Sequence, residues 1–187
     1  WERSNVVIGI ALDAKAAFPS VKKDVLLRNL RRRGIPETIV VWVGSFLEER
    51  SCFFVTEGTT SARLDADCGL PQGSPLSPIL YLFFNADLLD IFRTPHSFGL
   101  GYIDDLSAAI YAPSPELATA QVRVLLTKVE GWCRDHGTEM EGAKSHLIVL
   151  TPTKKTTTLE PILLNGVAIP RVDSVTFLGA RYDEQLN

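Results

Sequence analysis

The amino-acid sequence predicts an α+β fold in which an antiparallel sheet is backed by helices. Residues 6–12 form a short, apolar and β-branched run that is typical of a strand buried on both faces. Apolar residues alternate on either side of Asp104 and Asp105, which predicts two strands joined by a tight turn that carries the acidic pair. Several other segments have apolar residues at helical spacing, and such helices bury one face against a sheet.

Two helices are expected after the first strand. Apolar residues recur at helical spacing from Val21 to Leu30, and Gly34 stands where the first helix would end. Pro36 and Glu37 open the second helix, because proline and an acidic residue both favour a first helical turn.

A hairpin and a third helix are expected next. Residues 51–56 and 62–68 would pair around a Glu-Gly turn. Ser77 is then expected as an N-cap and Pro78 as the first residue of a helix. This helix is apolar nearly all round, which predicts that it is buried.

The remaining elements follow from local signals. Ser114 is expected to cap a long helix that ends at Gly137 and lines its inner face with apolar residues from Leu117 to Trp132. Residues 146–150 read as a strand and residues 151–158 as a polar loop. An Asn-Gly pair at 165–166, between two apolar triplets, predicts a tight hairpin.

Composition indicates one globular domain. The 187 residues carry a net charge of −3, and no apolar run is long enough to cross a bilayer, so we expect no membrane partner. The three cysteines and three histidines show no metal-ligand spacing, and an odd number of cysteines fits a reducing, intracellular setting in nucleus or cytoplasm. The chain begins without Met and without a secretory leader, so we expect it to be a piece of a longer protein.

The acidic pair is the strongest functional signal. An isolated Asp-Asp turn is usually just solvated, but here a third carboxylate, Asp13, stands at the exit of the first strand. Like charges held together are costly unless a cation neutralises them, and hard cations such as Mg²⁺ prefer carboxylate oxygens. A stiff Gly/Pro loop, residues 69–78, lies between the two acidic points in the sequence.

Four blocks of the sequence resemble the reverse transcriptase family in that family's order. They are Ala11-Leu12-Asp13-Ala14-Lys15-Ala16-Ala17-Phe18, Gly69-Leu70-Pro71-Gln72-Gly73-Ser74-Pro75, Tyr102-Ile103-Asp104-Asp105 and Phe177-Leu178-Gly179. The resemblance spans nearly the whole chain and is closest to the non-LTR retrotransposon and group II intron branch. Many relatives have a second Asp after the aromatic residue, where this chain has Pro19; that Asp is not a metal ligand in the family.

The resemblance implies the palm of a right-hand polymerase with part of its fingers. Residues 1–35 would hold a palm strand and helix with the first catalytic Asp, and residues 36–68 a fingers-side insertion. Residues 69–150 would carry the nucleotide loop and acidic hairpin, and residues 151–187 a hairpin like the primer grip. The N-terminal fingers and the thumb would lie outside this chain, which would also explain its acidic net charge.

The implied reaction is RNA-templated DNA synthesis, in which a primer 3′-hydroxyl attacks a deoxynucleoside triphosphate with the help of two Mg²⁺ ions. In such a scheme Mn²⁺ would be able to take the place of Mg²⁺. In this scheme Asp13 and Asp104 bridge both ions, Asp105 assists them, and the Ala14 carbonyl contributes a ligand. The expected macromolecular partners are an RNA template and a DNA primer.

The resemblance also assigns residues that contact substrate. Phe18 would exclude a ribose hydroxyl, and the rest of its block favours this role over the alternative of a core residue that packs on the following helix. The nucleotide-binding residues would be Phe18, Gln72, Gly73 and Lys144, and the primer-side residues would be Tyr102, Leu178 and Gly179. Lys144 would act near the pyrophosphate; the alternatives are a surface lysine or an imperfect P-loop, which would need a preceding strand.

Two further points stay open at the level of sequence. Arg28, Arg31, Arg32 and Arg33 could contact a nucleic-acid backbone, or they could simply pair favourably with a helix dipole. The chain could also be a catalytically silent palm that serves as a scaffold, or a decayed retroelement fragment. Retention of all three carboxylates argues against the scaffold.

Overall fold

The computed structural model describes residues 6–66, 68–150, 159–177 and 180–183. The chain consists of two compact units. One unit joins the chain up to Lys15 with the chain from Ala86 onward, and the other is Ala16–Asn85.

The first unit is built on a four-stranded sheet in the order β6-β7-β1-β8. Its strands are β1 (Val6–Leu12), β6 (Ser97–Tyr102), β7 (Asp105–Ala112) and β8 (His146–Leu150). Each neighbouring pair is antiparallel, and Ile8 at the centre lies opposite Ile110 on one side and Val149 on the other. The antiparallel sheet expected from the sequence is therefore confirmed.

The prediction that β1 is buried on both faces is wrong. Its residues alternate between buried and half-buried, with Ile8 and Ile10 on the buried face and Gly9 and Ala11 on the other. The cause is the architecture, because a helix, α4 (Pro115–His136), packs against β1 and β7 on one face of the sheet and leaves the second face partly open. This second face is called the open face below.

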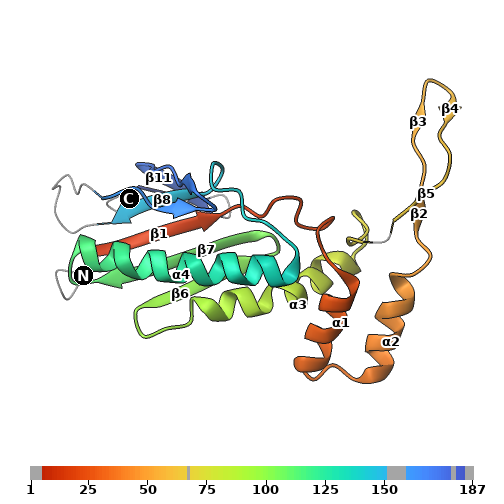
Figure 1. Ribbon diagram of the computed structural model, residues 1–187, viewed down its shortest axis with the longest axis horizontal. Helices are drawn as coiled ribbons and strands as arrows, with labels where there is room; N and C mark the ends of the chain where they lie inside the picture. The colour runs from red at the N-terminus through yellow and green to blue at the C-terminus, as the bar shows by residue number, and fades with distance from the viewer. Residues whose placement is uncertain (1–5, 67, 151–158, 178–179, 184–187) are drawn as a thin grey trace. The chain divides into compact units, whose positions relative to one another are not determined.

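Helix α4 (Pro115–His136) packs along β1 and β7 (Figure 1). Its start and end are as predicted: the Ser114 hydroxyl accepts a hydrogen bond from the Leu117 amide, and Gly137 ends the helix with a φ of 66°. The expected apolar face is correct from Val122 onward. It is wrong at Leu117, which is 53% exposed because the first turn of the helix buries Ala118 and Thr119 instead.

Helix α3 (Leu76–Ile91) begins two residues earlier than expected. Ser77 is not its N-cap, because the Ser77 hydroxyl lies inside the first turn and donates to the Pro71 carbonyl at 2.6 Å. Nor is α3 buried all round, since Ile79 and Leu82 are exposed. An apolar helix can expose part of its circumference where no neighbouring element of the described chain covers it.

Strand β6 turns two glycines, rather than its larger residues, toward the end of α3. A Cβ on Gly99 would lie 3.1 Å from the Phe92 Cβ, and a Cβ on Gly101 would lie 3.1 Å from a Leu89 methyl. Leu100 and Tyr102, which alternate with these glycines, are exposed. Close approach of helix and strand therefore selects glycine on the inner face.

The second unit contains α1 (Lys23–Arg32) and α2 (Glu37–Phe46), which pack against each other. Both helices lie where the sequence predicted them. Gly34 follows α1 with a φ of 78°, and its amide donates to the Arg31 carbonyl while the Ile35 amide donates to the Leu30 carbonyl. These two bonds form a Schellman motif that closes the helix.

A hairpin follows α2, made of short paired strands. They are β2 (Ser51–Cys52), β3 (Val55–Thr56), β4 (Thr59–Thr60) and β5 (Leu64–Asp65), with β3 paired to β4 and β2 to β5. The turn at Glu57 and Gly58 is confirmed, but the returning arm begins at Thr59 rather than residue 62.

The chain ends in two more hairpins. Asn165 and Gly166, both with positive φ, connect β9 (Leu163–Leu164) to β10 (Val167–Ala168), which confirms the predicted Asn-Gly turn. Strand β11 (Ser174–Phe177) pairs with β12 (Ala180–Asp183). The predicted loop 151–158 and the pair Leu178 and Gly179 lie outside the described residues. Among the helices of the described ranges, none is long and apolar enough to cross a membrane.

Candidate active site

The register of β1 against β7 brings the acidic residues to one end of the sheet. Leu12 lies opposite Leu106. Extending this pairing by one residue puts Asp13 opposite Asp105, the first residue of β7. Because Leu12 and Leu106 are both on the buried face, alternation assigns Asp13 and Asp105 to the open face.

The acidic hairpin has the form predicted from sequence. Tyr102 pairs with Asp105 across the end of the β6–β7 ladder, so Ile103 and Asp104 form a two-residue turn. Ile103 has a φ of 58°, a left-handed conformation that a two-residue hairpin of this kind requires. Asp104 and Asp105 are both exposed and Asp13 is half-buried, so all three carboxylates can reach a ligand from solvent.

The backbone around Asp13 is held by the segment that follows α4. The Glu141 amide donates to the Asp13 carbonyl at 2.8 Å, and the Lys15 amide donates to the Glu139 carbonyl at 2.9 Å. These bonds flank an isolated bridge between Ala14 and Met140. In such an antiparallel pair the N–H and C=O of the central residue point to the opposite side, so the Ala14 carbonyl is directed away from Met140.

This oxygen-rich set suits a hard divalent cation such as Mg²⁺. Within the described ranges, however, no three His, Cys, Asp or Glu side chains are gathered closely enough to hold a metal ion. Carboxylates repel one another, so a bound cation is what would draw Asp13, Asp104 and Asp105 together. The residues fit a divalent cation by ligand type, and the strands carry them to the same end of the sheet, from which a cation would draw them together.

Lys144 lies in the same unit and forms an ion pair with Glu141 at 2.8 Å. The Glu141 carboxylate raises the pKa of Lys144, first by its hydrogen bond and then by its charge, with a smaller contribution from the charge of Asp13. Lys144 is thus fully protonated at neutral pH and lies within the electrostatic reach of Asp13. A P-loop is ruled out here because a helix, α4, precedes the segment instead of a strand.

In the second unit, Phe18 shares a cavity with the Gly/Pro loop. Phe18, Gln72 and Gly73 line it together with Ser74, Ser77 and Pro78, and its volume is about 360 Å³. The Phe18 ring is half-buried and packs on Tyr81, with 5.3 Å between ring centroids. Three residues assigned to nucleotide binding from the sequence therefore surround one cavity.

Arg50 supports this loop, and the sequence patterns did not single it out. Its guanidinium donates to the carbonyls of Leu47, Cys68 and Gly69, at 3.3, 3.1 and 2.7 Å. Arg50 thus fastens the end of α2 to the start of the loop. An arginine immediately before a predicted hairpin is too common a surface feature for the sequence alone to reveal this role.

The arginine cluster at the end of α1 is partly engaged within the protein. Arg31 forms an ion pair with Glu37 at 2.6 Å, and Arg31 and Arg32 lie in the last turn of the helix. This hydrogen bond raises the pKa of Arg31 and lowers that of Glu37. The Arg31 guanidinium is therefore already paired with a carboxylate of this chain.

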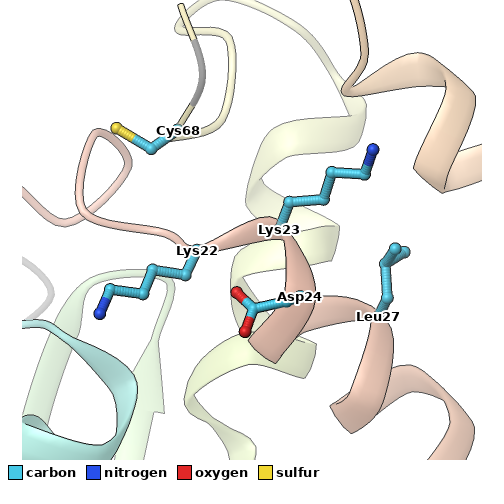
Figure 2. Close-up of a pocket in the computed structure, with 5 residues that line it drawn as sticks. All are labelled: Lys22, Lys23, Asp24, Leu27 and Cys68. Carbon is cyan, nitrogen blue, oxygen red and sulfur yellow. The ribbon is translucent and has the colours of Figure 1, made fainter.

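A second cavity lies at the start of α1, lined by Lys22, Lys23, Asp24, Leu27 and Cys68 (Figure 2). Lys23 is paired with Glu48 at 2.5 Å, and Asp24 contributes a negative charge to the same wall. The charges here largely offset one another, so this cavity has no strong preference for an anion.

The family model for reverse transcriptase (RNA-dependent DNA polymerase) matches residues 1–182. The RNA-directed DNA polymerase from mobile element jockey of Drosophila melanogaster is 28% identical over 192 residues, which cover 99% of this chain and 20% of that protein. A Pol polyprotein from type-1 retrotransposable element R2 of Nasonia vitripennis is 30% identical, over 77% of this chain and 14% of the polyprotein.

Solved structures agree on the fold. Apo telomerase from Candida tropicalis, truncated from its C-terminal domain, has a TM-score of 0.66 at 15% identity, covering 97% of this chain and 35% of that one. Telomerase from the same organism in complex with a fragment of telomeric RNA has a TM-score of 0.63 at 12% identity, covering 98% and 29%. At such identity the likeness establishes the fold alone, and it confirms the predicted palm with part of the fingers.

The chain spans about a fifth of the length of the jockey polymerase and of the polymerase from transposon BS. The curated relatives come from non-LTR retrotransposons, which confirms the branch expected from the four sequence blocks. Because the family model covers nearly the whole chain, the protein belongs to the reverse transcriptase (RNA-dependent DNA polymerase) family.

Proposed function

We propose that the protein containing this chain synthesises DNA on an RNA template, as part of a retrotransposon-type polyprotein. One observation supports this most directly. The β1–β7 register pairs Leu12 with Leu106, and extending it by one residue would put Asp13 opposite Asp105, beside the Asp104 turn, at the open face of the sheet. Carboxylates on neighbouring strands at one end of a sheet suit the two-cation chemistry of phosphoryl transfer.

In this proposal Asp13 and Asp104 hold the cations, Asp105 assists from the adjacent position, and the Ala14 carbonyl adds a neutral ligand. Two Mg²⁺ ions, when bound, would stabilise the attacking and leaving oxygens of the displacement. The contribution of these residues would be to position the cations and the reacting groups, because phosphoryl transfer depends mainly on alignment and on electrostatic stabilisation. The hydrogen bonds that fix the backbone of Asp13 support this role.

The cavity around Phe18 would receive the sugar and base of the incoming deoxynucleoside triphosphate. Gln72 and Gly73 line the same cavity, which supports their assignment to nucleotide binding. Tyr102, exposed beside the acidic turn, would contact the primer, and Leu178 and Gly179 are proposed as further primer-side residues. Lys144, whose raised pKa keeps it charged, would interact with the pyrophosphate.

A silent scaffold is the competing proposal, and exposure of the carboxylates counts against it. A scaffold has no need for three acidic residues at one strand end, whose mutual repulsion lowers stability. An RNA template, a DNA primer and deoxynucleoside triphosphates are the partners that follow from polymerase chemistry.

The test is extension of a labelled DNA primer on an RNA template by the protein that includes the segments flanking residues 1–187. We expect extension that needs all four deoxynucleotides and Mg²⁺, with Mn²⁺ able to substitute. A matched DNA template measures template preference. Tight binding of primer–template without any extension, under both metals, would favour the scaffold.

A further inference from the structure

Ser145 is a fully buried polar residue that touches the backbone of Asp13. Its side chain has no exposed surface, and its hydroxyl lies 3.2 Å from the Asp13 amide nitrogen, which donates to it. The same hydroxyl donates to the Glu141 carbonyl at 2.9 Å. One hydroxyl therefore joins the exit of β1 to the turn that follows α4.

The turn itself is closed by backbone bonds. The Ser145 amide donates to the Glu141 carbonyl at 2.9 Å, and the Glu141 amide donates to the Asp13 carbonyl at 2.8 Å. Both backbone groups of Asp13 are thus hydrogen-bonded: its N–H donates to the Ser145 hydroxyl, and its C=O accepts from the Glu141 amide. The Asp13 side chain projects from a peptide unit that has little freedom to move.

A hydroxyl is well suited to this place. It must accept a bond from one amide and donate another to a carbonyl, and a serine can do both at once. Removing it would leave the Asp13 amide and one lone pair of the Glu141 carbonyl without this partner, at a cost of roughly 1–3 kcal/mol if they stay dry. The larger consequence is that the strand exit could shift.

We propose that Ser145 is a positioning residue, which orients Asp13 for a divalent cation by fixing its backbone. This inference rests on the proposed function, because it takes Asp13 to be a cation ligand. Groups that orient metal ligands typically contribute a factor of about 10 to 100 in metal affinity, even though they do not touch the metal.

If Ser145 had a purely structural role, its loss would lower stability without changing metal affinity. Ser97, another buried and hydrogen-bonded serine of the same unit, provides the control for such a role. Ser97 is buried, donates to the Phe92 carbonyl at 2.8 Å and bonds the Thr94 hydroxyl at 2.7 Å. It sits at the opposite end of β6 from the acidic turn, so Ser97→Ala removes a comparable bond without affecting Asp13.

The experiment measures Mn²⁺ binding by electron paramagnetic resonance on the full-length protein, in wild type and in the variants Ser145→Ala, Ser145→Thr and Ser97→Ala. Thermal unfolding without metal is recorded for each. We expect Ser145→Ala to weaken Mn²⁺ binding about tenfold or more. Ser145→Thr, which keeps the hydroxyl, should restore it, and Ser97→Ala should lower stability while leaving affinity unchanged.

The outcomes separate this inference from the proposed function. If Asp13→Asn abolishes Mn²⁺ binding but Ser145→Ala leaves it intact, Ser145 is only structural and the inference is overturned. If Asp13→Asn itself leaves Mn²⁺ binding intact, Asp13 is not a cation ligand, and the proposed function is contradicted rather than the role of Ser145 alone. Should Ser145→Ala not fold, Ser145→Cys keeps the shape with a weaker hydrogen bond, and unchanged affinity in that variant would equally overturn the inference.

Discussion

The Leu70 amide donates a hydrogen bond to the Phe18 carbonyl at 2.8 Å. A second bond of the same length runs from the Gly69 amide to the Val21 carbonyl. The Gly/Pro loop is therefore tied directly to the turn that carries Phe18, and the cavity they share has a wall from each. A substitution at Gly69 or Leu70 should consequently shift the position of Phe18 as well.

Gly69→Ala should destabilise the protein and impair nucleotide binding. Gly69 has a φ of 81°, and a Cβ there would lie 2.9 Å from the Pro19 Cα and carbonyl oxygen. A left-handed backbone alone costs a residue with a Cβ roughly 1–2 kcal/mol, and the collision with backbone atoms adds to it. Gly58→Ala is the control, since its φ is 82° with nothing within 4 Å. Thermal unfolding should show the larger loss for Gly69→Ala; equal losses would mean that the loop accommodates the methyl group.

Phe18→Val should raise incorporation of ribonucleotides relative to deoxynucleotides by at least about tenfold, because a smaller side chain leaves room for a 2′-hydroxyl. Single-nucleotide primer extension with each sugar measures the ratio. Tyr81→Phe is a suitable control, since it keeps the ring that contacts Phe18. A variant that loses stability while its sugar preference stays unchanged would show that Phe18 is a core residue.

Much of the fold could be predicted because local signals were strong. The Ser114 cap, the Gly34 and Gly137 helix ends and the Asn165-Gly166 turn each depend on residues next to one another, and all were predicted correctly. The acidic hairpin was predicted from alternation alone. Where two signals overlapped, as in Ser74-Pro75-Leu76-Ser77-Pro78, the start of α3 was placed two residues late, because Ser77 bonds back to the loop instead of capping the helix.

Tertiary relationships could not be predicted in the same way. Nothing in the local sequence shows that Gly99 and Gly101 face α3, since this depends on how closely the helix approaches the strand. The contacts of Arg50 with the loop and of Ser145 with Asp13 join residues far apart in the chain. Candidate ligands were visible as motifs, whereas the residues that hold them in position were not.

Cys133 should be the unreactive thiol of the three. It is buried while Cys52 and Cys68 are exposed, and burial is the main reason that its pKa rises from 9.0 to about 11. At pH 8 a disulfide reagent should modify two thiols quickly in the folded chain and the third only after unfolding. The contribution of neutral Cys133 to stability should be present below pH 9 and be lost as pH rises through about 11. Modification of all three thiols at the same rate in the folded chain would contradict the burial of Cys133.

The 187-residue chain alone should bind primer–template weakly and extend it little. Its net charge is −3, and Arg31 in its densest basic cluster is already paired with Glu37. Few phosphates can be neutralised by so short a cationic track, and the affinity that remains should fall steeply with salt. Filter binding at several salt concentrations, with and without the flanking segments of the longer protein, measures this. Tight binding and processive synthesis by this chain alone would contradict it.

Substitution of the acidic residues tests the central claim most directly. Asp13→Asn and Asp104→Asn preserve size while removing the charge that a cation needs, and Asp87→Asn, on α3, serves as a control for the loss of an acidic group elsewhere. In the protein with its flanking segments, the measurement is the rate of Mg²⁺-dependent primer extension on RNA. We predict that each of the two variants folds normally and loses at least about a hundredfold in rate, while Asp87→Asn keeps it. Extension near the wild-type rate by a folded Asp13→Asn or Asp104→Asn protein would contradict the account.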